Sequence, residues 1–73
     1  MRYSVKSTIN GKDPKCWGTT DTWEDATILL LEQRDVIVSQ GVDEDTDEIL
    51  IDMPDSFLGT IDGKTYSLSI EVF

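Results

Sequence analysis

Histidine is absent from this sequence, and cysteine occurs only once. Without histidine the chain lacks a principal zinc ligand and the commonest general base, so most zinc-dependent and acid–base mechanisms are excluded. Cys16 has no second cysteine in the chain with which to form a disulfide. Because unpaired cysteine is typical of reducing compartments, we expect an intracellular, cytoplasmic protein.

Long apolar runs are lacking as well. The apolar run at residues 28–31 is followed directly by Glu32, and it is far shorter than the ~20 residues that a membrane helix needs. The N-terminal segment 1–8 is too polar for a secretion signal. We therefore expect no membrane segment, and a length of 73 residues predicts one small domain spanning residues 1–73.

Basic residues are scarce: six stand against fifteen acidic ones, which gives a net charge of −9. The imbalance is uneven, because residues 21–55 contain twelve acidic residues and only one basic residue, Arg34, whereas residues 1–20 are net positive. Phosphate contacts supply most of the affinity for nucleic acids and need cations, so direct binding to DNA or RNA is disfavoured. An acidic surface instead attracts a basic partner protein and accelerates association.

Two short segments of similar sequence, residues 8–12 and 60–64, each place Asn-Gly or Asp-Gly between extended flanks. Such a dipeptide is the strongest local signal for a hairpin with a type I′ turn. Pro14 lacks a backbone donor, so its strand should lie at a sheet edge or contain a bulge. The strands of the two hairpins are expected at residues 2–9, 12–18, 57–61 and 64–72.

A helix is predicted over residues 22–34. Asp21 is a suitable N-cap, and Glu24 stands three residues later, as in a capping box. Apolar residues then recur at helical spacing on one face.

The next segment, residues 36–38, is a run of β-branched residues and favours a buried strand. The alternative continues the helix to Gln40 with Gly41 as its C-cap. We favour the strand, and we expect another at residues 48–52. The predicted fold is α+β, an antiparallel sheet with one helix packed on one face, in the order β-β-α-β-β-β-β.

The acidic stretch between these last two strands partly matches a calcium-binding loop. Asp43, Asp45 and Asp47 match the first, third and fifth positions of an EF-hand loop. The sixth position needs glycine but is Glu48, and the twelfth needs glutamate but is Pro54. The pattern therefore predicts no metal site, and we expect no cofactor.

Catalysis is also disfavoured. A glycosidase needs two carboxylates on opposite sides of a cleft in contrasting environments, whereas residues 43–48 should share one solvated loop. Cys16 has no histidine to activate it as a nucleophile. The glycines are scattered and form no phosphate-binding loop. We therefore expect a protein that is not an enzyme.

In an extended segment, residues two apart point the same way, about 6.5 Å apart. Asp43, Asp45 and Asp47 would then form a row of negative charges that mimics a nucleic-acid backbone. The alternative is that the acidic residues only keep a small domain soluble.

The chain contains Asp35–Val38, then Asp43-Glu44, then Thr46–Glu48, followed by another predicted strand. This order of segments resembles the central hairpin of phage uracil-DNA glycosylase inhibitors. The resemblance covers residues 35–73 and implies a small acidic α+β protein that mimics DNA and occupies the enzyme's DNA-binding cleft. In that family the acidic penetrating segment lies on the first strand after a helix, whereas Arg2–Ile9 contains no acid here. In size and charge alone, the chain also resembles other phage inhibitors of host defence, including anti-CRISPR proteins, which would act in the host cytoplasm.

The leading hypothesis is an inhibitor that binds a basic nucleic-acid-binding protein through its acidic face. Apolar anchors are also needed, because charge contributes more to steering than to residence time. The second hypothesis is a structural or regulatory subunit that pairs through a sheet edge, as in a homodimer. The predicted contacts are, first, Asp43, Glu44, Asp45, Asp47 and Glu48; second, Asp21, Asp25, Glu32 and Asp35; and, as anchors if exposed, Trp17 and Phe57.

Overall fold

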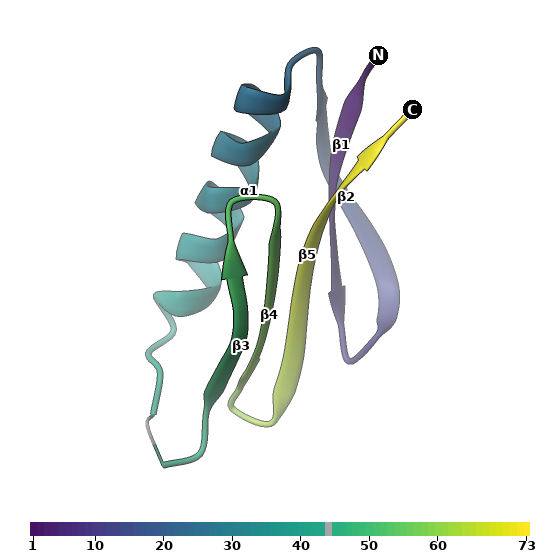
Figure 1. Ribbon diagram of the computed structural model, residues 1–73. Helices are drawn as coiled ribbons and strands as arrows, with labels where there is room; N and C mark the ends of the chain where they lie inside the picture. The colour runs from purple at the N-terminus through teal and green to yellow at the C-terminus, as the bar shows by residue number, and fades with distance from the viewer. Residues whose placement is uncertain (44) are drawn as a thin grey trace.

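The computed structural model describes residues 1–43 and 45–73, which form one five-stranded antiparallel sheet and one helix (Figure 1). The strand order across the sheet is β2-β1-β5-β4-β3. The predicted α+β class is confirmed, with one strand fewer than expected. In chain order the elements are β1 Tyr3–Ile9, β2 Lys12–Thr20, α1 Trp23–Val38, β3 Glu48–Met53, β4 Ser56–Ile61 and β5 Lys64–Val72.

Both predicted hairpins form, and their turns have the backbone conformation that the sequence indicates. Asn10 and Gly11 have φ values of 56° and 71°, and Asp62 and Gly63 have φ values of 53° and 77°. Positive φ at both central residues is the signature of a type I′ turn. The two turns lie at the same end of the sheet, where the Asn10 side chain accepts a hydrogen bond of 2.9 Å from the backbone N–H of Thr65.

The strand that contains Pro14 lies at an edge of the sheet, as predicted. The pairing of β2 with β1 also shows two register irregularities, one between Val5 and Lys6 and one between Ser7 and Ile9. A proline at an edge removes no ladder hydrogen bond, and bulges twist an edge away from further pairing. This edge is therefore poorly suited to receiving another strand.

The core lies between α1 and one face of the sheet, where the helix contacts β1, β2 and β5 (Figure 1). The opposite face of the sheet carries hydroxyl pairs, Thr8 with Ser67 and Thr60 with Thr65. The sheet thus has one apolar and one polar face, as the alternation in β5 predicts. The buried apolar residues are Val5, Ala26, Leu30, Ile37, Phe57, Ile61 and Leu68.

The prediction of a strand at residues 36–38 is wrong, because these residues form the last turn of α1. Ile37 lies two helical turns after Leu30, so a helix places both side chains in the same core. This burial outweighs the modest helix penalty of β-branched residues. The helix ends at Val38 with Ser39 as its C-cap, and Gly41 follows with a φ of 93°. The predicted end at residue 34 was therefore too early, and the competing alternative was closer.

The N-cap of α1 is Thr22 and not Asp21. The Thr22 hydroxyl accepts a hydrogen bond of 3.2 Å from the backbone N–H of Asp25. Asp21 instead makes an exposed ion pair of 3.3 Å with Arg2. Adjacent threonine and aspartate are both good caps, so local sequence could not choose between them.

Among the residues described here, no helix has the length and apolar character needed to cross a membrane.

The assignment of the cap predicts different effects for two neighbouring substitutions. Thr22→Ala should lower the free energy of unfolding by about 1 kcal/mol, because the N-terminal amides of α1 lose their side-chain acceptor. Asp21→Ala should change it by less than about 0.5 kcal/mol, because an exposed ion pair contributes little. Urea unfolding of both variants measures the difference, and a larger loss for Asp21→Ala would contradict the assignment.

Candidate protein-binding surface

The acidic loop, residues 41–47, connects α1 to β3 and closes on itself. The backbone carbonyl of Asp43 accepts hydrogen bonds from the N–H groups of Thr46, at 3.2 Å, and Asp47, at 2.7 Å. The carboxylate of Asp43 accepts a further bond of 2.9 Å from the N–H of Asp45. These contacts curl the chain into a turn, so the prediction that Asp43, Asp45 and Asp47 form an extended row is wrong. Glu44, the remaining predicted contact in this loop, lies outside the described residues.

Asp47 joins the acidic loop to the turn between β4 and β5. Its carboxylate accepts hydrogen bonds from the backbone N–H groups of Asp43, at 2.9 Å, and Asp62, at 3.0 Å. These two backbone bonds, that from Asp43 first, lower the pKa of Asp47 below its ordinary value. Asp43 and Asp47 thus hold the loop, whereas Asp45 and Glu48 are exposed at its end.

The acids predicted along the helix are all exposed. Asp25 and Glu32 are seven residues apart, so they lie on the same side of α1, separated by two turns. Asp35 lies further round the helix and forms an ion pair of 3.4 Å with Arg34. The helix therefore adds separate carboxylates to the surface and not a continuous row. Among the described residues, no group of three or more acidic or cysteine side chains is placed to hold a metal ion.

The two aromatic candidates have different environments. Phe57 is 1% exposed and belongs to the core. It was predicted as a binding anchor only if exposed, so it cannot serve as one in this fold. Trp17 is 39% exposed on the edge strand β2. Its indole N–H donates a hydrogen bond of 2.7 Å to the Ser7 hydroxyl, and the Lys15 ammonium lies 4.2 Å from the ring centroid. Trp17 is thus fixed in position while part of its ring faces solvent.

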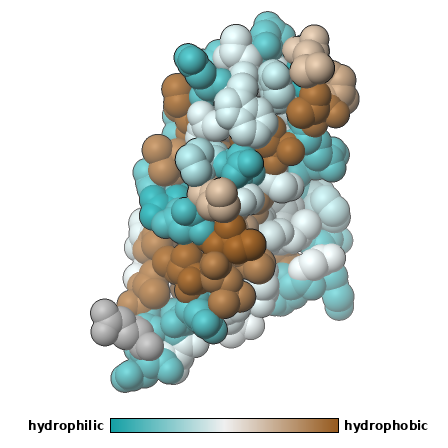
Figure 2. Space-filling model, in the orientation of Figure 1, coloured by the Kyte–Doolittle hydropathy of each residue, from teal (hydrophilic) through white to brown (hydrophobic). Residues whose placement is uncertain are grey.

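The structure also reveals a surface that the sequence reasoning did not identify, centred on the second edge strand, β3. All six residues of β3 are exposed, including four large apolar side chains. Figure 2 shows apolar side chains gathered along this strand in the lower half of the view. The sequence signal was the uninterrupted run Ile49-Leu50-Ile51, which lacks the alternation expected of a strand with one wet face.

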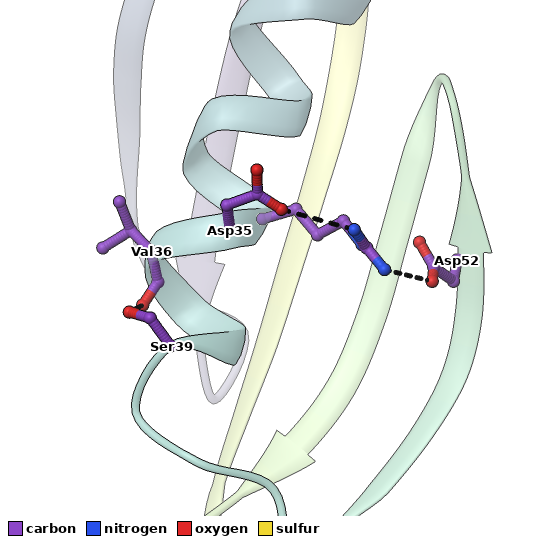
Figure 3. A network of polar contacts seen from close by, with 5 residues as sticks. Asp35, Val36, Ser39 and Asp52 are labelled. Atoms are coloured by element: carbon purple, nitrogen blue, oxygen red, sulfur yellow. Dashed lines mark hydrogen bonds and ion pairs between the residues drawn. The ribbon is translucent and has the colours of Figure 1, made fainter.

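An ion pair connects this strand to the helix (Figure 3). The guanidinium of Arg34 donates to the carboxylate of Asp52 at 2.7 Å, and on its other side it contacts Asp35. Asp52 faces Phe57 across the β3–β4 ladder, so it points toward the side of the sheet that the helix covers. Arg34, the only basic residue in the acidic segment, is therefore already engaged.

Above this ion pair, α1 and the β3–β4 turn border a groove of about 360 Å³. Its walls are largely apolar, and Ile28, Leu31 and Met53 are each about half exposed. The groove exists because the helix lies over β1, β2 and β5 and leaves the β3 side of the sheet uncovered.

Comparisons with protein-family models, curated proteins and solved structures found no match to this chain. The resemblance to phage uracil-DNA glycosylase inhibitors stays a prediction from sequence. One part of it fails, because residues 35–38 are helical and do not form a hairpin with the strand at Glu48–Met53.

The hydrogen bonds of Asp47 predict a pH-dependent contribution to stability. A carboxyl whose pKa is lower in the folded chain than in the unfolded chain stabilises the folded state above its unfolded pKa, about 3.9. This contribution is lost as the pH falls through the lower, folded pKa. Asp47→Asn should therefore lower the urea midpoint at pH 7, and the difference from the parent protein should shrink below about pH 4.

Asp45→Asn is the matched control, because it removes the same charge from the same loop. Among the described residues, the backbone N–H of Asp45 donates a hydrogen bond to Asp43, whereas the Asp45 carboxylate accepts none. Its urea midpoint should stay close to that of the parent protein. Equal effects of Asp45→Asn and Asp47→Asn at pH 7 would contradict the role of Asp47.

Proposed function

We propose that this protein is a non-enzymatic inhibitor that binds a nucleic-acid-binding protein and covers its basic surface. The observation that carries the proposal is the charge of residues 21–55, where twelve acidic residues accompany a single basic one. Arg34 is paired with Asp52 and Asp35, so it does not offset the field of the remaining carboxylates.

Inhibition would work by occupancy. A protein that grips phosphates with lysine and arginine accepts carboxylates at the same positions, and opposite net charges raise the rate of encounter. The structure changes which acids are suited to this role, because Asp43 and Asp47 are engaged within their own loop. The exposed carboxylates of Asp25, Glu32, Asp45 and Glu48 are the better candidates. A DNA glycosylase or a CRISPR nuclease is the kind of target that the resemblance of the sequence implies.

An affinity capture tests this proposal. The immobilised protein should retain a DNA- or RNA-binding protein from a nuclease-treated bacterial lysate at low salt and release it at high salt, because screening weakens contacts between exposed charges. The captured protein is then purified, and its binding to nucleic acid should be lost when this chain is added. Failure to retain any nucleic-acid-binding protein, or unchanged nucleic-acid binding in the presence of saturating inhibitor, would refute the proposal.

A pair of double variants tests the acidic contacts. Asp45→Asn with Glu48→Gln should weaken binding to the captured protein about tenfold at low salt. The control, Asp13→Asn with Glu71→Gln, removes the same charge outside residues 21–55 and should weaken binding less than about threefold. Equal losses in the two variants would show that only net charge matters.

The exposed edge of β3 favours a second candidate function, a regulatory subunit that forms a homodimer through this strand. Light scattering separates the two candidates, because a homodimer has twice the 8.2 kDa mass of the chain.

A further inference from the structure

We propose that β3 and the adjacent groove receive an extended segment of the partner protein, one in which basic and apolar side chains alternate. The inference rests on the proposed function, since it names the surface and the chemistry by which that partner is held. Three features of the molecule carry it: a strand edge without proline or lysine, an apolar groove beside this edge, and acidic residues around both.

The first feature is the outer edge of β3. This strand pairs with β4 on one side, and within residues 1–43 and 45–73 no strand pairs with its other side. Edge strands offer a row of backbone donors and acceptors to an incoming strand, and proteins usually protect such edges with proline, lysine or bulges. The opposite edge, β2, has Pro14 and two lysines, whereas β3 has neither residue type and a single irregularity between Ile49 and Ile51. Adding a strand to β3 would extend the sheet and cover its exposed apolar side chains.

The second feature is the groove between α1 and the β3–β4 turn. It borders the end of β3 at Asp52 and Met53, and on the helix it reaches Ile28 and Leu31. A strand added to β3 would point every second side chain toward the side of the sheet that α1 covers. Apolar side chains at those positions would enter the groove and bury the exposed faces of Ile28 and Leu31.

The third feature is the negative charge around β3, which favours a basic segment as the occupant of this edge. Glu48 and Asp52 lie on β3, and Asp45 and Asp55 lie just beyond its two ends. Glu48 faces Thr60 across the β3–β4 ladder, so it lies on the polar side of the sheet, whereas Asp52 lies on the helix side and is paired with Arg34. Lysine or arginine at the positions of an added strand that face the polar side would lie beside Glu48, with Asp45 and Asp55 beyond the two ends. Opposite charges across a ladder are stabilising.

A second copy of this chain fits the same edge poorly. Antiparallel pairing of β3 with β3 of another copy would bring Asp45 and Glu48 of each chain toward Asp55 of the other. Like charges that face each other across a strand pair repel, and each copy carries a net charge of −9. A basic segment meets no such repulsion.

The probe is a synthetic peptide of about eight residues in which lysine and valine alternate, long enough for one strand. Fluorescence anisotropy at low salt should show binding, and the amide signals of residues 48–53 should shift in NMR spectra. The same peptide N-methylated at the residues whose N–H groups would pair with β3 keeps its charge and its valines. It should bind at least about tenfold more weakly, because it cannot donate to the strand edge.

Two charge-matched variants locate the site on the protein. Leu50→Lys places a positive charge on β3 at a position that is 57% exposed, and it should weaken binding of the lysine–valine peptide about tenfold. Phe73→Lys makes the same change in charge at a position that is 64% exposed and lies after β5, and it should leave the affinity within about twofold.

Equal binding of the two peptides, equal affinities of the two variants, or shifts confined to residues outside β3 would each overturn the inference. Capture of a salt-sensitive nucleic-acid-binding protein alongside such a result would leave the proposed function standing. Conversely, binding of the peptide at β3 without capture of any such protein would support the inference and count against the proposed function. Protection of the β3 amides in a peptide-free dimer would overturn it by identifying a second copy as the occupant.

Discussion

One helix of sixteen residues cannot cover a sheet of five strands, and this shortfall determines most of the surface of the molecule. The helix packs over β1, β2 and β5, which lie together at one side of the strand order. In a chain of 73 residues little apolar material remains for the other side. Phe57 and Ile61 bring β4 into the core, but β3 lies beyond the reach of the helix, and all its residues are exposed. The groove and the apolar patch are consequences of this one mismatch in size.

Arg34 and Asp47 compensate for the mismatch in different ways. Arg34 reaches from α1 to Asp52, so the helix holds β3 through an ion pair where apolar packing is missing. Asp47 holds the other end of the uncovered region, because its carboxylate gathers backbone N–H groups from its own loop and from the β4–β5 turn. The Arg34–Asp52 and Asp47–Asp62 contacts each join residues more than a dozen positions apart in sequence. The acidic stretch therefore contains residues whose contacts hold the fold together and residues that make no such contact. Net charge alone does not distinguish the two kinds.

Local chemistry made the turns and the strand pairs predictable. Asn10-Gly11 and Asp62-Gly63 adopt the positive φ that these residue types favour in a two-residue hairpin turn, and Pro14 restricts its strand to an edge by lacking a donor. The C-terminal end of α1 was not predictable in the same way, because Val36-Ile37-Val38 has strand propensity and only the burial of Ile37 beside Leu30 keeps it helical. The conformation of the acidic loop likewise depends on Asp62, a residue distant in sequence. The exposed apolar surface on β3 was missed because a run of apolar residues predicts a buried strand, and only the position of the helix shows that this strand is not covered.

The acidic residues around β3 make solubility and recognition parts of the same explanation. An apolar edge strand in a small domain invites aggregation, and proteins that protect such an edge with lysine or proline close it to every partner. Protection by Glu48 and by the acidic residues beyond the two ends of β3 is different, because it acts through the sign of the charge. It repels further copies of this chain, which are equally acidic, and it leaves the edge open to a strand of opposite charge. If β3 receives a basic segment as proposed, the same acidic residues would both oppose self-association and favour that partner, so solubility and binding would have one physical cause at this surface.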